Sequence, residues 1–482
     1  MNSSIQGLFM PSRLIGLSTL LLTLFLTGCT GGSPEKLTTH RSPEVPQGVP
    51  HKIERLQESS DGEDSIDVIE GEVGLGKCIE MALRRNPGLV AARWDADAAG
   101  HSVDMAQSAR LPELRATADY TDYINDQPLI AIGGDPRASR FTDDIASASL
   151  VVDVPIYTGG RITNRIEAAK LLRMASTHTL ARTRKELVFN VTSMFYSILA
   201  QRHVIESVRF SRKALKEHLE QVKNLITNQK ATKSDRLRTE VRLADVKEEL
   251  ARQRNALQVK LHTLRKLLGL SDLSTELDPA GQLKFDAETS PDSNTALSAA
   301  YDARSDLAAT RKKVKAQSRK LDVARAEYWP NITFQAAYGP RWDVSHMSKA
   351  EDAGRFGVGL SLPLFEGGRI RANVLKQKSE LEAARQRLRQ LKDQVQLEVR
   401  TAMENVSSAK ERVQASQKAI EQGKESLRIE RVKYRNGRAS VTEVLDAQDD
   451  LLRSQRNYYR ALADYHTALA QLRLATGKDD LK

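Results

Sequence analysis

The sequence predicts a mixed α/β protein made of two similar halves, each with two β-strands and a long helical hairpin. Three observations support this fold class. A nine-residue motif occurs twice, as VPIYTGGRI at 154–162 and as LPLFEGGRI at 362–370. Residues 161–268 contain neither Gly nor Pro, and 369–476 contain only two Gly, which is typical of long helices. Four short stretches alternate between apolar and polar side chains, which is the period of a β-strand.

The N-terminus predicts an exported lipoprotein. Residues 1–28 carry one charged side chain, Arg13, followed by the apolar run Leu14–Leu26, which is too short to span a bilayer and typical of a secretory signal. Two small residues and Cys29 follow and resemble a lipobox, in which the cysteine receives the lipid; the alternative is a chance cysteine behind a signal. Because Thr30 stands where Asp would resemble an inner-membrane retention signal, we expect a lipid anchor at the outer membrane, with 1–28 as the lipoprotein signal peptide.

Composition and motifs argue against nucleic acid and against enzyme chemistry. The formal charge is +11, but an exported protein meets no genome. Once Cys29 is acylated, Cys78 has no partner for an intrachain disulfide and is interpreted as a small apolar filler in a helix. Gly71–Cys78 nearly matches a phosphate-binding loop, but Cys78 stands where Ser or Thr would bind magnesium. With no HExxH, CxxC or nucleophile elbow and only scattered His, we predict no enzyme, no catalytic residue, no cofactor and no metal site.

Equivalent residues in the two halves define the domain organisation. Residues 29–70 are rich in Pro, Gly, Ser and acidic residues and are predicted to be a tether. Asn86–Leu89 lies 218 positions before Arg304–Leu307, whereas Gly159 lies 208 positions before Gly367. The change of offset places a difference of ten residues between two strands, where a loop would absorb it. We predict a first repeat at 71–285, a second repeat at 286–478 and a tail at 479–482.

Each half is expected to end in a long helix, a turn and a second helix. Arg161–Asn228 would form a helix roughly 100 Å long at about 1.5 Å per residue, which suits a tube through the periplasm better than a globular core. The turns are predicted near 228–230 and 436–438. Side chains at seven-residue spacing mark a seam against neighbouring helices, as in coiled coils: Leu243, Leu250, Leu257 and Leu264 in the first half, and Leu451, Tyr458, Tyr465 and Leu472 in the second.

Four predicted strands alternate strictly in hydrophobicity: Leu114–Tyr123, Ala146–Ile156, Ile332–Tyr338 and Phe356–Leu364. Alternation over about ten residues suits a membrane barrel with lipid outside and water inside. A half-buried soluble sheet alternates in the same way, but export and the lipid anchor favour the membrane. Four strands cannot close a barrel, and an open edge would leave its amides unsatisfied in lipid. The chain is therefore expected to share a barrel with copies of itself, and the arithmetic allows two, three or four copies.

The repeated motif is expected to join each half's second strand to its long helix, through Pro155, Gly159 and Gly160 in the first copy and Pro363, Gly367 and Gly368 in the second. Each proline lacks an N–H and is expected to end the sheet ladder. Each glycine pair can adopt positive φ, so the chain can turn sharply from strand to helix. Arg161 and Arg369 would follow at the inner lipid surface, where they either bind phosphates or remain solvated charges.

The twin halves, the Asn-Pro-x-Leu helix start, the two Pro-x-x-x-Gly-Gly-Arg junctions and the Gly-closed hairpins together resemble the TolC-type outer-membrane efflux proteins, in particular their lipoprotein members, over about residues 71–478. The resemblance implies a homotrimer with a shared 12-stranded β-barrel continued by a long α-helical barrel. It implies an exit duct of a tripartite efflux or type I secretion system, with an inner-membrane pump and a periplasmic adaptor as partners. The adaptor would dock at the turns: Asn228, Gln229, Lys230, Asn436, Gly437 and Arg438.

The resemblance also implies an acidic gate just after the turns. The matching positions are Glu443 and Asp446, with Asp235 in the first repeat, and three-fold symmetry would gather these carboxylates around one axis. The sequence departs from the family at two positions. A basic latch residue falls on Ala439, and Gln229 stands where Gly is common. The acids are therefore either the gate or ordinary charges on the hairpin surface.

The alternative function is a periplasmic adaptor lipoprotein, which also has a lipobox and a helical hairpin. Such a protein would show one hairpin and a lipoyl-like β domain, not two halves with four alternating strands. The sequence leaves the transported substrate, the ion selectivity and the class of pump and adaptor open.

Overall fold

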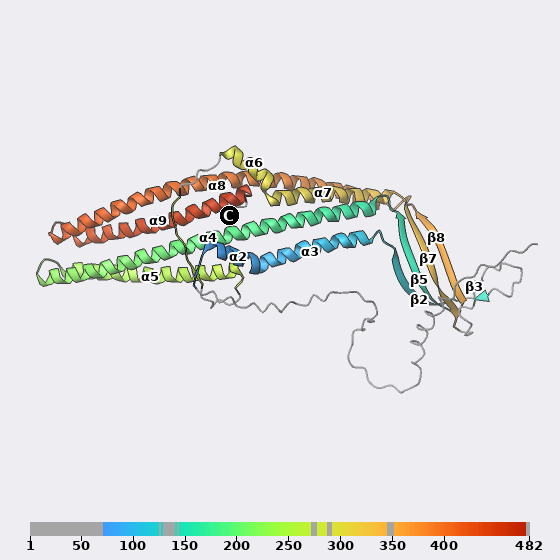
Figure 1. The fold of residues 1–482 in the computed structure, drawn as a ribbon, viewed down its shortest axis with the longest axis horizontal. Coiled ribbons are helices and arrows are strands. Elements are labelled where there is room, and N and C mark those ends of the chain that lie inside the picture. The colour runs from blue at the N-terminus through green and yellow to red at the C-terminus, as the bar shows by residue number, and fades with distance from the viewer. Residues whose placement is uncertain are drawn as a thin grey trace, which may run out of the picture. The chain divides into compact units, whose positions relative to one another are not determined.

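The computed structural model describes residues 71–124, 127–128, 140–141, 144–270, 277–286, 292–344 and 351–478. They belong to one compact unit, Val68–Lys482. The predicted signal peptide, tether and C-terminal tail, and with them Cys29, lie outside the described residues. Within the unit, long helices run side by side and a four-stranded sheet lies at one end of them (Figure 1).

The two halves repeat the same helices. The first half contains α2 (Leu75–Arg85), α3 (Pro87–Ser108), α4 (Arg161–Thr227) and α5 (Lys233–Leu268), and the second contains α6 (Ser293–Ala303), α7 (Ser305–Arg325), α8 (Arg369–Arg435) and α9 (Val441–Thr476). A 3-10 turn, Ala326–Tyr328, follows α7. Helices α4 and α8 each span 67 residues, and α5 and α9 each span 36, which confirms the predicted long hairpins. No helix in the described part of the chain is both long and apolar enough to cross a membrane.

Residues at equivalent positions set the helix ends. Asn86 precedes α3 and donates its side-chain N–H to the carbonyl of Leu267 at 2.9 Å. Arg304 takes the equivalent position before α7 and donates to the carbonyl of Ala475 at 3.3 Å. Helices α5 and α9 end in the left-handed conformation that favours glycine, at Gly269 and Gly477. The C-terminal end of α5 is thereby bonded to the start of α3, and the C-terminal end of α9 to the start of α7.

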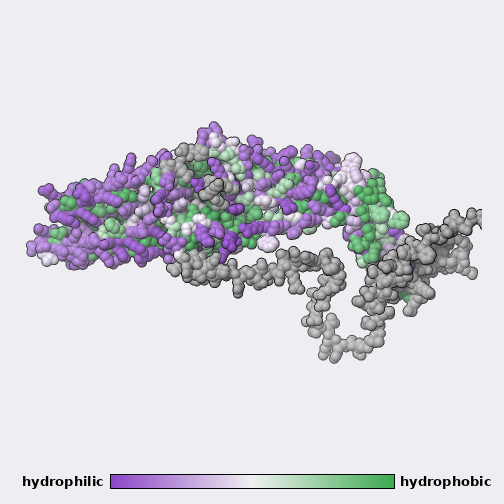
Figure 2. Space-filling view, viewed as in Figure 1, coloured by the Kyte–Doolittle hydropathy of each residue, from purple (hydrophilic) through white to green (hydrophobic). Residues whose placement is uncertain are grey.

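The sheet consists of β2 (Glu113–Asp122), β5 (Asp144–Tyr157), β7 (Asn331–Asp343) and β8 (Glu351–Ser361), all antiparallel, in the order β2-β5-β7-β8. Two short pairs accompany it: β1 (Glu72–Val73) with β6 (Asp278–Pro279), and β3 (Gln127–Pro128) with β4 (Arg140–Phe141). Among the described residues, β2 and β8 each have a partner strand on one side only. Figure 2 shows apolar side chains gathered on the sheet, whereas polar residues cover most of the visible helices.

The two faces of the sheet differ in chemistry. One face exposes large apolar side chains: Leu114, Tyr120, Leu150, Phe356, Val358 and Leu360. The other face carries polar side chains that bond across the strands. Thr117 and Ser149 share a hydrogen bond of 2.9 Å, and Gln335 donates to Asp153 at 2.7 Å. An exposed apolar face opposite a hydrogen-bonded polar face is the pattern of a wall between lipid and water.

The structure corrects the expectation for Pro155. This proline does not end the ladder but lies inside β5 opposite Thr333, and the register shifts directly after it. Because the pairing of β2 with β5 stops at Asp153, β5 has only one neighbour at this point. A proline and a bulge are tolerated where a strand is paired on one side.

The boundaries of β8 also differ from the predicted Phe356–Leu364. The strand runs from Glu351 to Ser361, because its partner β7 begins at Asn331, directly opposite Ser361. Pro363 therefore lies beyond the strand rather than at its last paired residue. The alternation of hydrophobicity continues for three residues after the ladder has lost its partner.

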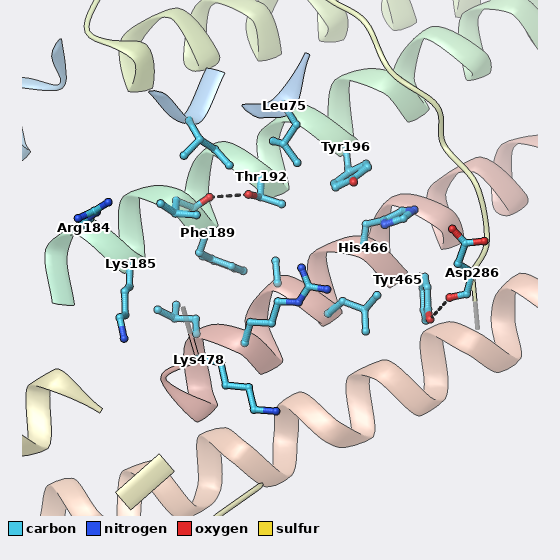
Figure 3. Close-up of a pocket in the computed structure, with 16 residues that line it drawn as sticks. Leu75, Arg184, Lys185, Phe189, Thr192, Tyr196, Asp286, Tyr465, His466 and Lys478 are labelled. Carbon is cyan, nitrogen blue, oxygen red and sulfur yellow. Dashed lines mark hydrogen bonds between the residues drawn. The ribbon is translucent and has the colours of Figure 1, made fainter. Parts of the chain in front are cut away.

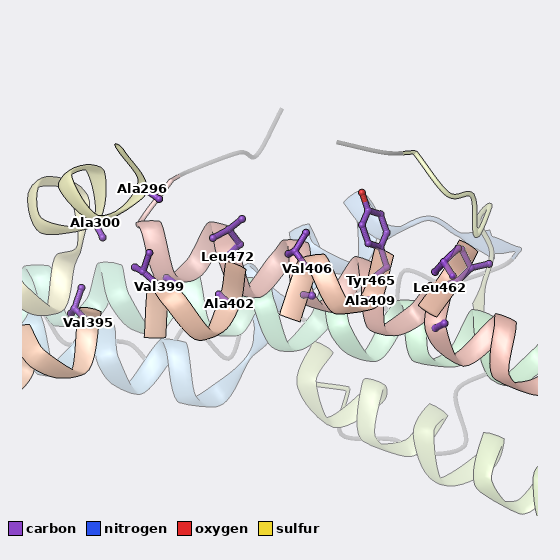
Figure 4. Packing of buried hydrophobic residues seen from close by; sticks show 14 of the residues in the cluster. Ala296, Ala300, Val395, Val399, Ala402, Val406, Ala409, Leu462, Tyr465 and Leu472 are labelled. Carbon is purple, nitrogen blue, oxygen red and sulfur yellow. The ribbon is translucent and has the colours of Figure 1, made fainter. Parts of the chain in front are cut away.

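Buried side chains follow the predicted seams between the helices. Leu243, Leu250 and Leu264 are buried on α5, and Leu451, Tyr465 and Leu472 are buried on α9. The other two predicted seam residues, Leu257 and Tyr458, are partly buried and pack against the same clusters, which confirms the seven-residue pattern. One cluster joins α6, α7, α8 and α9 (Figure 4), and small residues such as Ala300, Ala402 and Ala409 lie fully buried within it. Cys78 is buried in α2, where burial raises the pKa of its thiol to about 11, as expected for a filler rather than a nucleophile.

Candidate functional site

The two helical hairpins close with the same turn at the end far from the sheet (Figure 1). In each, an Asn caps the long helix and the next residue has a positive φ, 58° in Gln229 and 70° in Gly437. The following residue, Lys230 or Arg438, donates its N–H to the carbonyl five residues earlier, at 2.7 and 2.9 Å. This is the Schellman motif. The predicted docking residues are all exposed: Asn228, Gln229, Lys230, Asn436, Gly437 and Arg438.

Two of the three predicted gate acids cap helices. The Asp235 carboxylate accepts the N–H of Thr232 at 2.9 Å, and the Glu443 carboxylate accepts the N–H of Ser440 at 2.6 Å. Each hydroxyl in turn accepts the N–H of its acid, which completes a capping box at the start of α5 and of α9. Asp446, one turn further along α9, is exposed and forms no hydrogen bond or ion pair within the described residues.

Contacts between α5 and α9 hold the two hairpins together near the turns. Arg238 donates to the hydroxyl of Thr442 at 2.8 Å, and Arg242 pairs with Asp449. Further from the turns, Arg456 and Glu249 form an ion pair of 3.1 Å. These bridges fix the acids of the two halves relative to each other within one chain.

A buried polar cluster lies between the hairpins behind the turns. The His218 side chain of α4 is only 5% exposed, and its ring centroid lies 5.3 Å from that of Tyr434 on α8. Arg431 of α8 donates to the side-chain oxygen of Gln448 on α9 at 2.8 Å. Burial first, and then the charge of Arg431, lower the pKa of His218 to about 4. Sequence reasoning missed this cluster, because its members are separated by long stretches of chain.

The junctions between sheet and helices match the predicted backbone. Their φ angles are 61° and 82° at Gly159 and Gly160, and 59° and 84° at Gly367 and Gly368. The surroundings of the two junctions differ. A Cβ on Gly159 would lie 2.5 Å from Cβ of Trp329, whereas a Cβ on Gly367 would meet no atom within 4 Å.

The two junction arginines also differ in their contacts. Arg369 pairs with Glu327 at 3.0 Å and bonds to Glu366 at 2.6 Å, so its charge is neutralised within the chain. Arg161 borders a cavity of about 600 Å³ that Asp153 and Thr333 of the sheet also line. Because Asp153 and Thr333 lie on the polar face of the sheet, this cavity faces the side opposite to the apolar surface. The two alternatives for these arginines, phosphate binding or a solvated charge at the inner lipid surface, stay predictions.

A smaller cavity of about 310 Å³ lies over the seam of α4 and α9 (Figure 3). Tyr196 stacks on His466 with ring centroids 4.1 Å apart, and the Tyr465 hydroxyl donates to the carbonyl of Asp286 at 2.7 Å. Arg184 and Lys478 also line this cavity. The hydrogen bond to Asp286 holds the segment 277–286 against α9. Within the described ranges, no group of three or more His, Cys, Asp or Glu side chains is arranged to hold a metal ion.

A sheet with one exposed apolar face, joined twice through Gly-Gly turns to helices of 67 residues, defines a class of outer-membrane channel proteins built from twin repeats. The outer membrane efflux protein family matches residues 78–270 and 296–478, so the chain belongs to this family. Its two matched segments fall on the two halves.

Individual proteins similar to this chain are outer membrane proteins as well. Outer membrane protein OprJ of Pseudomonas aeruginosa is 24% identical over 377 residues, which cover 74% of this chain and 74% of OprJ. Outer membrane protein TolC of Vibrio cholerae is 24% identical over 379 residues, covering 77% of this chain and 83% of TolC. The crystal structure of the outer membrane protein VceC of Vibrio cholerae has a TM-score of 0.71 at 20% identity, covering 84% of this chain and 96% of VceC. The TolC-like fold and the efflux-channel class are thereby confirmed, and the adaptor alternative is wrong.

Proposed function

We propose that three copies of this chain form one exit duct, which receives substrates from a periplasmic adaptor and an inner-membrane pump and releases them outside. The sheet carries this proposal. It exposes an apolar face, yet β2 and β8 leave one edge each without a partner among the described residues. Unsatisfied N–H and C=O groups in lipid cost several kcal/mol each, and single-chain barrels start at about eight strands. Three copies would supply 12 strands and close the barrel.

The adaptor is proposed to dock at the two turns, Asn228–Lys230 and Asn436–Arg438. These turns are exposed, lie at the far end of the helices from the sheet (Figure 1), and repeat the same backbone geometry. Three chains would present six equivalent turns to a ring of adaptors.

Thiol labelling in intact cells tests this topology. Cysteine in place of Ile124, beyond the end of β2, should react with an impermeant maleimide from outside, and cysteine in place of Gln229 should not. After osmotic opening of the outer membrane, the Gln229→Cys variant should react as well. Labelling of Gln229→Cys in intact cells would invert the proposed orientation.

The lipid anchor and the domain boundaries are proposed from the sequence. We place the lipid on Cys29 after removal of residues 1–28, with 29–70 as a tether to the first repeat at 71–285. The second repeat would follow at 286–478. The lipid would hold the chain at the inner leaflet of the outer membrane while the barrel closes.

The gate is proposed to consist of Glu443 and Asp446, with Asp235 from the first repeat. Three copies would bring six carboxylates from α9 to one opening, where they repel one another and attract cations. Wild-type channels in planar bilayers should therefore be blocked by divalent cations.

A matched control variant distinguishes the proposed gating role of Glu443 from its role in the capping box of α9. Glu443→Ala with Asp446→Ala removes two charges and one half of the capping box. Ser440→Ala breaks the same capping box and leaves both charges in place. We expect cation block to disappear in the double variant and to persist in Ser440→Ala. If the double variant is blocked as wild type is, these acids are surface charges.

A further inference from the structure

The cavity of about 310 Å³ over the seam of α4 and α9 has no role in the proposed duct, yet its lining resembles that of a binding site. Four cationic side chains and one carboxylate, that of Asp286, line it. An apolar wall with a few charged groups is typical of sites for small organic ligands. That wall is formed by side chains of α2, α4 and α9 (Figure 3): Leu75, Ile79, Phe189 and Leu469.

The cations of this cavity come from both halves of the chain. Arg184 and Lys185 belong to α4, and Lys478 follows α9 directly. Lys185 already donates to the carbonyl of Gly477 at 2.8 Å, so it has a structural role. Arg184 and Lys478 are exposed and form no hydrogen bond or ion pair with any residue that the structure describes. Two positive charges are therefore available to an anion at the end of the cavity next to Gly477.

The other end of the cavity is aromatic. Tyr196 and His466 stack there with an interplanar angle of 9°. Burial raises the pKa of the Tyr196 hydroxyl, although the charge of Arg473 acts against it, so the hydroxyl keeps its proton. This hydroxyl forms no hydrogen bond within the described ranges. Arg184 and Tyr196 are 12 positions apart on α4, or about 18 Å at about 1.5 Å per residue, so the cavity is elongated.

The internal repeat indicates that the fold does not require this set of side chains. The offset of 208 positions between the two junctions also relates α4 to α8 and α5 to α9, and the related helices have equal lengths. Arg184 keeps its charge under this offset, as Lys392, but other positions change their chemistry. The equivalents of Lys185, Tyr196 and Lys478 are Asp393, Glu404 and Leu270. An acidic or apolar set is thus compatible with the same helices, so the cations of this cavity point to a ligand.

We propose that this cavity binds a small anionic amphiphile, with its carboxylate, sulfate or phosphate head between Arg184 and Lys478. Charge-assisted hydrogen bonds hold the head, and the apolar chain lies along Phe189 and Leu469 towards the aromatic end. The ligand is a solute rather than a lipid of the bilayer. Arg184 lies 23 positions from Arg161, where α4 leaves the sheet, which is about 35 Å along the helix.

Equilibrium dialysis of radiolabelled decanoate against the whole protein in nanodiscs tests the site, with uptake by empty nanodiscs subtracted. Arg184→Gln with Lys478→Gln removes both cations that lack a partner, and the affinity for decanoate should fall about tenfold or more. Lys392→Gln is the matched control, because Lys392 is the exposed equivalent of Arg184 on α8, and it should bind decanoate as wild type does. Decanamide has the same chain without the charge and should bind the wild type and the double variant equally.

A second variant tests whether the apolar chain enters the cavity. Ala470 lines the cavity and is partly buried, so Ala470→Phe should fill it and abolish binding without changing the charge. The double variant exchanges only exposed side chains and tests the proposal even if Ala470→Phe fails to fold.

Three results would overturn the proposal. The first is that wild type retains no more decanoate than empty nanodiscs. The second is that the double variant, or folded Ala470→Phe, binds decanoate as tightly as wild type. The third is that decanoate binds only after Asp479→Asn with Asp480→Asn, because acids of the chain itself would then neutralise the two cations.

Discussion

Replacing Arg304 by Ala should destabilise the helical part of the protein, because this side chain is a buried charge with two partners. The Arg304 side chain is 1% exposed and lies 2.6 Å from both the Asp306 and the Glu398 carboxylates. Although burial alone would raise the pKa of Asp306, its hydrogen bonds with Arg304 hold that pKa below its usual value. Breaking a fully buried pair costs about 3–5 kcal/mol. The two carboxylates are 21% and 35% exposed, so water hydrates them in part, and we expect about 2–3 kcal/mol.

Circular dichroism at 222 nm during heating measures this loss in the detergent-solubilised protein. Arg385→Ala is the matched control, because Arg385 is an exposed arginine on α8 whose ion pair with Glu382 spans 2.7 Å. An exposed pair of this kind contributes about 0–1 kcal/mol. The melting midpoint should fall by several degrees in Arg304→Ala and stay nearly unchanged in Arg385→Ala. Equal midpoints in the two variants would refute the assignment of Arg304 as a buried structural charge.

Three further predictions follow from single residues. The unfolded His218 side chain binds a proton below pH 6.5, whereas the folded one does so only near pH 4. The stabilisation of the folded state by neutral His218 is therefore complete above pH 6.5, and about 3 kcal/mol of the free energy of unfolding is lost as the pH falls towards 4. The melting midpoint of His218→Phe should fall less over this range than that of the wild type, and parallel curves of midpoint against pH would contradict this prediction. Gln229→Gly should stabilise the first turn by about 1 kcal/mol, because Gln229 is held at a φ of 58°, and an unchanged midpoint would show that no strain is stored there. Cys29→Ser should abolish palmitate labelling, and equal label in both proteins would remove the lipoprotein assignment.

Features that depend on nearby residues could be predicted from the sequence. The lengths of the long helices follow from the missing Gly and Pro, and the junction follows from two adjacent glycines. The capping boxes are also visible in the sequence, as Thr232-x-x-Asp235 and Ser440-x-x-Glu443, although the prediction for these acids was a gate or ordinary charges on the hairpin surface. That pattern alone would have shown that Asp235 and Glu443 have a structural role in each chain.

Features that depend on where another segment ends could not be predicted. Pro155 is tolerated inside β5 only because the pairing with β2 stops at Asp153. The burial of His218 depends on Tyr434 and Arg431 of α8, more than 200 positions away. No local pattern reports such contacts, and the repeat does not help, because these side chains have no counterparts of the same type in the other half.

Differences between the halves are informative where several equivalent positions change together. The second half has Arg304, Asp306 and Glu398 in contact, and the equivalent positions in the first half are Asn86, Gly88 and Asn190. One half therefore uses a charged set and the other a neutral set at the same helix start, and both sets donate to an equivalent carbonyl, of Ala475 and of Leu267. A buried charge is costly when it is left alone but dispensable when its partners are replaced with it. Arg304→Asn by itself should thus destabilise the protein, because it leaves two carboxylates without their cation. Adding Asp306→Gly and Glu398→Asn should recover most of the lost stability. The second half would then carry the same three residue types, Asn, Gly and Asn, that the first half has at this helix start.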